Sequence, residues 1–305
     1  MKFPFSEYIW FDGKLVPMNM AKVSVTTHAI HYGTSIFEGI RAYWNSRNLH
    51  IFRLKDHVKR FRNSGKFYNI KLNFSDKQIE NAVIALCKKN KIKKSCYIRP
   101  FYFVGQYGIN FHVTQKAPTH TAIFAFPFGD LFNKNGITAT ISKWRKFSDM
   151  STPTQAKMGG NYLNSILATQ DAKQRGFDEA ILLDQSGNVS EAPGENIFLV
   201  KNNMLVTPSL SSSALDGITR RSIITLAKDM KLKIKTQKVS KKELKMADEI
   251  FLSGTAAEIT PVIKIDKKKI GEGKVGNITK LFMATYSDIV MNKSENYSHW
   301  LTAVY

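Results

Sequence analysis

The feature that most constrains the fold is the irregular order of strand-like and helix-like segments along the 305 residues. Strand patterns rich in β-branched and aromatic residues are interrupted by helical patterns at uneven intervals. A Rossmann sheet or a TIM barrel would instead show a regular alternation of strand and helix. The length is also sufficient for two medium domains. We therefore predict an α+β protein with two domains.

Several short signals locate individual elements within this mixture. Residues 8–11 and 14–16 are strand-like and flank Asp12-Gly13, a dipeptide that adopts the positive φ angles of a tight hairpin turn. Capping boxes, in which a serine is followed three residues later by Gln or Glu, predict helix starts at Ser75 and Ser240. Apolar spacing predicts further helices over 53–68, 161–175, 219–230 and about 278–289. Apolar and β-branched runs predict further strands over 97–104, 121–126, 137–141, 180–184, 196–200 and 204–207.

The pattern of regular elements breaks over residues 129–136, where Gly, Asp and Asn residues accumulate. We expect an interdomain linker there, between a small N-terminal domain (1–128) and a larger C-terminal domain (137–305). A long hairpin loop would produce the same break.

The composition excludes several classes of protein. Hydrophobic residues make up 43% of the chain, which is enough for a substantial core and argues against disorder. The apolar runs are too short to span a bilayer and no signal-peptide pattern is present, so we expect a soluble cytoplasmic protein without a membrane partner. Cys87 and Cys96 are too few for a disulfide framework or a zinc site, so no metal is expected.

The net charge is the one extreme property: 45 Lys and Arg against 24 Asp and Glu give +21. Such a charge suggests a nucleic-acid partner. The lysines are scattered over turns and polar helix faces, however, without interleaved aromatic residues. We therefore expect a solvated basic surface and no nucleic-acid partner; salt-resistant, sequence-specific binding would revive the alternative.

The first segment that suggests chemistry is 151–162, which carries Lys157 between a strand and a helix. Small residues flank this lysine, so its side chain can leave water, and burial lowers the pKa of an amine by disfavouring the ammonium. A lysine of this kind can form a Schiff base. An ordinary surface lysine would give the same sequence, so this segment alone leaves both interpretations open.

Three later segments place polar groups at turns. Glu191 and Glu195 surround a Pro-Gly turn, and a carboxylate there can keep a pyridine nitrogen protonated. In residues 213–220 a glycine precedes a helix start, whose unpaired amides suit a phosphate. Residues 251–261 form a strand ending in Gly-Thr-Ala, where amides can approach an anion closely. Solvated glutamates, a simple helix entry and a hairpin corner are the plain alternatives.

Together with residues 31–41 (HYGTSIFEGIR) and 97–100 (YIRP), these segments resemble the fold-type IV enzymes that use pyridoxal 5′-phosphate (PLP), most closely the bacterial branched-chain amino acid aminotransferases. The resemblance covers nearly the whole chain in order. It implies a small N-terminal α/β domain, a larger C-terminal domain with a pseudo-barrel, and an active site between them. It also implies ping-pong transfer of the amino group of leucine, isoleucine or valine to 2-oxoglutarate, and a homo-oligomer, with a dimer as the minimal unit and hexamers frequent in bacteria.

The resemblance assigns the cofactor site position by position. Lys157 matches the catalytic lysine that forms the aldimine with PLP and moves the proton of the substrate Cα. Glu191 matches the partner of the pyridine nitrogen, and Arg60 matches the arginine that grips the phosphate. The other matches are Tyr162 at the phenolic oxygen, Leu215 on the ring, Glu195 as a supporting carboxylate near Arg60, and Gly217, Ile218, Thr219 and Thr255 around the phosphate.

The same resemblance implies a substrate pocket in which an apolar wall is combined with one movable cation. Arg99 would meet the distal carboxylate of glutamate, while Phe37 and Tyr32 would surround an aliphatic side chain. The α-carboxylate would be held by Tyr97 and by the turn with Thr255, Ala256 and Ala257.

Two pocket positions and one loop pair depart from the best-known bacterial pattern. Phe128 stands where that pattern has tryptophan, and Leu131 stands where it has a tyrosine near the glutamate carboxylate. Asn110-Phe111 replaces a smaller Gly-Val pair in the loop that closes over the site. We predict that the pocket keeps branched aliphatic substrates and binds glutamate or aromatic substrates differently.

The closest alternatives share the fold: a D-amino acid aminotransferase, an aminodeoxychorismate lyase or an (R)-selective amine transaminase. None is expected to carry Tyr97-Ile98-Arg99 together with the 254–257 turn. A purely structural scaffold would require all these matches to be accidental, and its purified form would be colourless.

Overall fold

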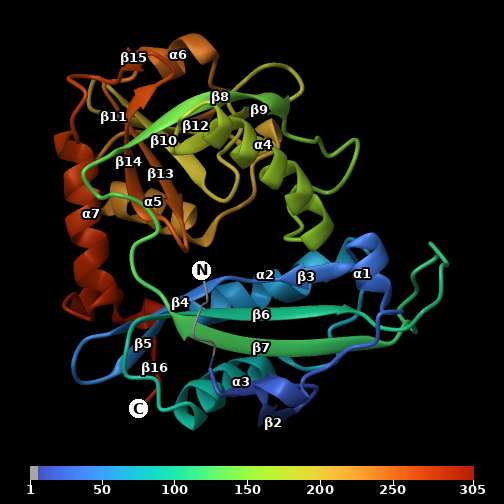
Figure 1. The fold of residues 1–305 in the computed structure, drawn as a ribbon. Coiled ribbons are helices and arrows are strands. Elements are labelled where there is room, and N and C mark those ends of the chain that lie inside the picture. Colours follow the sequence, from blue (N-terminus) through green and yellow to red (C-terminus); the bar gives the residue numbers. More distant parts are fainter. Residues whose placement is uncertain (1–5) are drawn as a thin grey trace. The chain divides into compact units, whose positions relative to one another are not determined.

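The structure is a computed structural model, and it describes residues 6–305. The chain forms two compact units. The first contains the described residues up to Gly129, together with Ala156–Gly160 and Asp288–Tyr305; the second contains Asp130–Gln155 and Asn161–Ser287. Each unit combines a mixed array of helices with its own sheet, which confirms the predicted α+β class (Figure 1).

The first unit is built on an antiparallel sheet. Its strand order is β16-β5-β4-β6-β7-β1-β2, and β3 pairs with β6 beside this path. The strands are β1 (Tyr8–Phe11), β2 (Lys14–Pro17), β3 (Ser35–Phe37), β4 (Ile40–Trp44), β5 (Leu49–Phe52), β6 (Cys96–Val104), β7 (Thr119–Pro127) and β16 (Leu301–Ala303). The helices are η1 (Met18–Met20), α1 (His28–Tyr32), α2 (Leu54–Lys66), α3 (Asp76–Lys89) and η4 (Glu295–Trp300).

The local signals of the first unit are confirmed. Asp12 and Gly13 both have positive φ, 44° and 93°, and join β1 to β2 in register. The Ser75 hydroxyl accepts a hydrogen bond from the Gln78 amide, and the Gln78 side chain accepts one from the Ser75 amide in return. The apolar faces of α2 and α3 then close one core with the sheet, around residues such as Phe61.

The second unit is built on a mixed sheet of order β12-β11-β10-β13-β14-β8-β9, with β15 paired to β14. The strands are β8 (Ile137–Arg145), β9 (Glu179–Leu183), β10 (Asn196–Lys201), β11 (Met204–Pro208), β12 (Ile234–Gln237), β13 (Glu249–Gly254), β14 (Glu258–Ile265) and β15 (Lys268–Lys269). The helices are α4 (Tyr162–Gln174), η3 (Leu210–Ser212), α5 (Ile218–Asp229) and α6 (Lys241–Lys245). Two further helices, η2 (Gly159–Asn161) and α7 (Asn277–Val290), cross the division between the two units. The second capping box, at Ser240, is confirmed at the start of α6.

The division differs from the predicted domains at two segments that the sequence analysis assigned to 137–305. Residues 301–303 form β16, which pairs with β5 and therefore belongs to the first unit. Ala156–Gly160 also joins that unit, because Met158 forms a bridge to Ile36 and the Gly160 amide bonds the Gly33 carbonyl. Both differences arise from pairing between residues far apart in the sequence.

Two negative findings concern only residues 6–305. None of their helices is long and apolar enough to cross a membrane. Within the same residues, no group of His, Cys, Asp and Glu side chains has an arrangement that could hold a metal ion.

Candidate functional site

The segment that carries Lys157 is anchored in the first unit by its backbone. The Lys157 amide donates to the Ser64 hydroxyl (3.0 Å), and its carbonyl accepts from the Phe37 amide (3.1 Å). The Lys157 side chain is half-buried, with Nζ 4.8 Å from the centre of the Phe37 ring. The backbone of α2 and β3 therefore fixes the position of this lysine, while its side chain stays partly accessible.

A buried carboxylate organises the neighbouring part of this unit. Glu38 is fully buried and accepts two hydrogen bonds from Arg60, from Nε (2.7 Å) and Nη2 (2.8 Å). The His57 Nδ1 lies 2.8 Å from the same carboxylate. Burial alone would raise the pKa of Glu38, but the charges and hydrogen bonds of Arg60 and His57 hold it well below its usual range. Arg60 is thereby held rigidly by a bidentate ion pair.

The structure brings together four of the predicted substrate residues in this unit. Arg99 donates from Nη2 to the Tyr97 hydroxyl (3.1 Å) and stacks its guanidinium 4.7 Å from the Phe37 ring centre. Phe128 lies against Tyr97, with ring centres 5.4 Å apart. Gly39 is required here, because a Cβ at this position would collide with the Tyr97 hydroxyl. The cluster thus combines aromatic walls with one cation.

Arg41 contacts this cluster through Phe128, and it was not among the predicted site residues. Its guanidinium is buried, lies 5.2 Å from the Phe128 ring centre and donates from Nη2 to the Phe128 carbonyl (3.3 Å). A cation stacked on an aromatic face both orients and stabilises that ring.

Tyr32 occupies a different place in the first unit. Its ring packs against His28 and Phe111, with ring centres 4.6 and 5.0 Å away. These three residues help to line a cavity of about 470 Å³ that also includes Met158. Phe111 is 79% exposed, so the loop that carries it presents an apolar tip to the surroundings.

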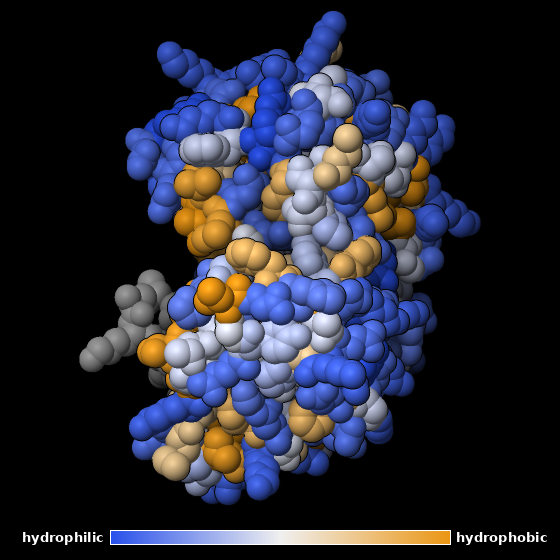
Figure 2. Space-filling model, turned by 90° about the vertical axis from the view of Figure 1, so that its right-hand side faces the viewer, coloured by the Kyte–Doolittle hydropathy of each residue, from blue (hydrophilic) through white to orange (hydrophobic). Residues whose placement is uncertain are grey.

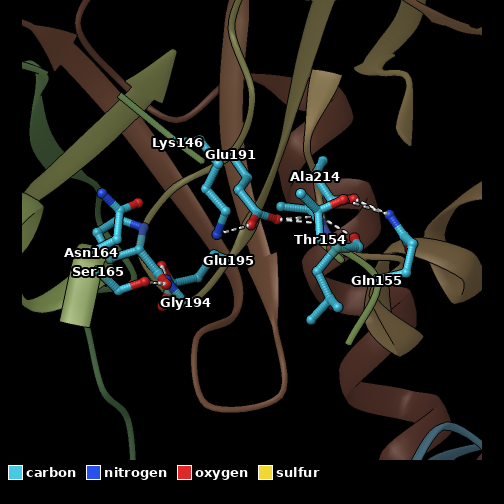
Figure 3. Close-up of polar contacts among 12 residues, drawn as sticks. Lys146, Thr154, Gln155, Asn164, Ser165, Glu191, Gly194, Glu195 and Ala214 are labelled. Atoms are coloured by element: carbon cyan, nitrogen blue, oxygen red, sulfur yellow. Dashed lines mark hydrogen bonds and ion pairs between the residues drawn. The ribbon is translucent and has the colours of Figure 1, made fainter. Parts of the chain in front are cut away.

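In the second unit, Glu191 is a buried carboxylate surrounded by donors (Figure 3). Its Oε1 is 2.7 Å from the Lys146 ammonium. Its Oε2 accepts from the Asn196 side chain (3.1 Å) and from the Leu215 amide (2.9 Å). These bonds tie three separate segments to one carboxylate. Lys146 was not selected in the sequence analysis.

The start of α5 is an open anion-binding geometry. Gly217 is its N-cap residue and has no side chain that could cap the helix. The amides of Ile218 and Thr219 therefore point out of the helix end without a hydrogen bond from an N-cap side chain. A Cβ at Gly217 would collide with the Asn196 side chain, which itself bonds Glu191. The turn before α5 is held by Gln155, which bonds the Ala214 carbonyl (2.8 Å) and the Asp216 amide (3.1 Å).

The remaining predicted residues of the second unit lie at turns and helix starts. The half-buried Thr255 and Ala256 form the β13–β14 turn, with Ala257 buried behind them. Lys134 ties this turn to the 129–136 loop through an ion pair with Glu258 (2.6 Å). Leu131, in the same loop, is 46% exposed, whereas Glu195 is buried and Tyr162 begins α4.

The candidate residues therefore form two sets, one in each unit. Four functional candidates were missed: Glu38, Arg41, His57 and Lys146. Two signals could have found three of them. Glu38 and Arg41 lie within the 31–41 motif, and His57 is three residues from Arg60 on one face of α2. The burial of Lys146 depends on pairing between distant segments.

The buried His57 generates a prediction about pH. Burial, followed by smaller opposing effects of Glu38, lowers its pKa below the ordinary value of 6.5. His57 therefore binds a proton more readily in the unfolded chain than in the folded one. Its contribution to the unfolding free energy is complete above about pH 6.5 and is lost as the pH falls. We expect His57→Gln to flatten the fall in unfolding free energy between pH 6.5 and 5, by at most ~1.4 kcal/mol per pH unit.

Urea unfolding at several pH values measures this slope directly. The matched control is His31→Gln, on the exposed side of α1. Parallel curves for the wild type and His57→Gln would contradict the assignment.

Comparisons with known proteins identify the family of the chain. Residues 35–265 match the family model described as amino-transferase class IV. The chain is 41% identical to the branched-chain-amino-acid aminotransferase of Escherichia coli K12, covering 98% of each protein. It is also 41% identical to a probable branched-chain-amino-acid aminotransferase of Aquifex aeolicus, over 98% of this chain and 97% of that protein.

Solved structures give the same result. A branched-chain aminotransferase from the archaeon Thermoproteus uzoniensis, solved with norvaline, aligns with a TM-score of 0.95 at 41% identity, covering 98% of this chain and all of the other. The T.th. branched-chain amino acid aminotransferase, complexed with N-(5′-phosphopyridoxyl)-L-glutamate, aligns over the full length of both chains with a TM-score of 0.96 at 39% identity. The chain therefore belongs to the class IV aminotransferases and, within them, to the branched-chain-amino-acid aminotransferase family.

Proposed function

We propose that this enzyme uses PLP to transfer the amino group of leucine, isoleucine or valine to 2-oxoglutarate, giving the branched-chain 2-oxo acid and glutamate. The observation that carries the proposal is the similarity over the full length to relatives named for this reaction. The T.th. relative has also been solved with pyridoxamine 5′-phosphate and with 4-methylvaleric acid, a branched aliphatic acid.

The residues present fit PLP. A phosphate suits the α5 start, where Gly217 leaves the helix end without a capping side chain. Arg60 would add a positive charge, with its guanidinium already oriented by Glu38. Glu191 is a buried carboxylate that suits a protonated pyridine nitrogen. When bound, PLP supplies an electron-withdrawing ring that stabilises negative charge on the substrate Cα.

The other proposed cofactor contacts follow from the family pattern. Tyr162 would bond the phenolic oxygen and Leu215 would pack on the ring. Thr255 would add a hydroxyl to the phosphate site, and Glu195 would be a supporting carboxylate for Arg60. Lys157 would carry the cofactor covalently through its amine.

For the reaction itself we propose that Lys157, once released, moves the α-proton between the substrate and the cofactor. The half-buried side chain and the hydrogen-bonded backbone of its segment support this role. A residue that carries a proton needs an anchored backbone and an amine that can move. The two substrates would then use the site in turn, in a ping-pong sequence.

Substrate selection follows from the aromatic cluster of the first unit. Phe37 and Phe128 of this cluster would contact an aliphatic side chain, and Tyr97 with the 255–257 turn would hold the α-carboxylate. Tyr32 lies outside the cluster, against His28 and Phe111, and would add a further apolar wall. Arg99 would pair with the distal carboxylate of glutamate and otherwise stack on Phe37. This dual use avoids leaving a desolvated, unpaired cation beside leucine.

Exposed apolar groups support the proposed homo-oligomer. Leu163, Ile166 and Leu167 form an exposed apolar face on α4, and Phe111 lies at the tip of an exposed loop. Figure 2 shows a surface that is hydrophilic overall, with separate hydrophobic patches. Such patches are typical of subunit interfaces. We propose a dimer as the minimal unit, with a hexamer as the larger alternative assembly.

The direct test is glutamate formation from L-leucine and 2-oxoglutarate by the protein supplied with PLP. We expect Lys157→Ala to lower kcat by at least about 10³-fold, because it removes both the covalent anchor and the base. The matched control is Lys267→Ala, at an exposed turn, which should retain activity. Activity with D-alanine instead of L-leucine would assign the chain to the D-specific branch, and an active Lys157→Ala variant would refute the role of Lys157.

Leu131 generates a second prediction. Its apolar, 46% exposed side chain offers no hydrogen bond to a distal carboxylate. We expect Leu131→Tyr to raise kcat/KM for glutamate relative to leucine by about 10- to 150-fold, since one hydrogen bond to a charged group contributes roughly 1.5–3 kcal/mol. Leu131→Phe adds the ring without the hydroxyl and is the matched control. An unchanged ratio in Leu131→Tyr would sink the idea.

A further inference from the structure

Lys146 is a buried cation that lies directly on the Glu191 carboxylate (Figure 3). Only 7% of the residue is exposed, and its ammonium is 2.7 Å from Glu191 Oε1. A lysine is rarely buried without a specific partner, because removing an ammonium from water is costly. The arrangement therefore needs an explanation beyond surface charge.

The backbone of Lys146 is fixed on both sides. Lys146 lies just beyond the end of β8. Its amide donates to the Leu183 carbonyl (2.8 Å), and its carbonyl accepts from the Gln185 side chain (2.7 Å). The ammonium also lies 4.8 Å from the centre of the Phe147 ring. These contacts fix the main chain from which the Lys146 side chain reaches Glu191.

Lys146 forms an ion pair with Glu191 at hydrogen-bond distance. A second cation, Arg220, is buried, which lowers its pKa, although the charges of Asp216 and Glu191 act in the opposite direction. Its guanidinium donates to the Pro208 carbonyl (3.1 Å) and lies 3.8 Å from Asp216. Arg220 therefore contributes through the longer-range field, whereas Lys146 makes the hydrogen-bonded ion pair.

We infer that Lys146 is a positioning residue for the reaction, acting through Glu191. It orients one carboxylate oxygen and supplies a counter-charge that offsets the cost of burying the negative charge. Without this counter-charge and this orientation, Glu191 would pair less favourably with a protonated pyridine nitrogen, and the electron-withdrawing power of the ring would fall. This inference rests on the proposed function.

The test compares Lys146→Met, which keeps the apolar stem, with Lys146→Arg, which keeps the charge. Lys143→Met is the matched control, because Lys143 is an exposed lysine near the end of β8, three residues before Lys146. Three quantities are measured: the Kd of PLP for the cofactor-free protein, the ¹⁵N resonance of PLP labelled at its ring nitrogen, and kcat and KM for L-leucine.

We expect Lys146→Met to shift the ¹⁵N resonance towards the unprotonated ring, to weaken PLP binding about 10-fold and to lower kcat at least about 10-fold, with a smaller change in KM. Lys146→Arg should restore the resonance and most of kcat. Lys143→Met should match the wild type. A Lys146→Met protein that has only a lower Tm, with an unchanged resonance and kcat, would overturn the inference.

A double-mutant cycle covers the case in which Lys146→Met folds poorly. If Lys146 acts through Glu191, then adding Lys146→Met to Glu191→Gln should cost little further PLP affinity, because the neutral amide needs no counter-charge. Full additivity of the two effects would overturn the inference. A wild-type protein that forms no glutamate would instead refute the proposed function, and this role with it.

Discussion

Each compact unit builds its part of the candidate site around one buried carboxylate. In the first, Glu38 receives the fork of Arg60 and the ring of His57. In the second, Glu191 receives the ammonium of Lys146 together with two neutral donors. A buried carboxylate is tolerated only when such partners satisfy it, so each one imposes a position on every group that it contacts. The need to satisfy these two buried carboxylates therefore fixes the positions of the groups around them.

The backbone provides the same precision for groups that must reach a ligand. The Lys157 segment is held by Ser64, Phe37 and Ile36, which fixes its main chain and leaves any movement to its side chain. The turn before α5 is held by Glu191 through the Leu215 amide. A helix start that is fixed but not capped by a side chain is suited to a phosphate. A transaminase requires cofactor-binding groups that stay accessible on backbone segments held in place by hydrogen bonds.

Local chemistry explains which elements could be predicted from the sequence. Asp12-Gly13 has the backbone freedom that a tight hairpin needs, and the capping boxes satisfy helix amides within four residues, so both signals are independent of distant contacts. The short strands β3, β4, β5 and β16 carry no such signal. Their existence depends on pairing with partners that can be more than 200 residues away, as for β16 and β5.

The predicted site residues differ from the missed ones in how far their roles depend on distant contacts. Motifs such as 31–41 and the 254–257 turn are recognisable from their order and residue types. Glu38 and Arg41 belong to the first motif, but their partners, like that of Lys146, come from other segments, and a sequence does not state which charges will be buried together. Only the folded chain shows that Lys146 meets Glu191 rather than solvent.

The most direct test of the account is to locate the covalent link to the cofactor. The protein is saturated with PLP, reduced with borohydride, digested and examined by mass spectrometry. The account predicts a phosphopyridoxyl group on Lys157 and none on the other lysines. A modification distributed over exposed lysines, with Lys157 unmodified, would contradict the central claim that this residue carries the cofactor.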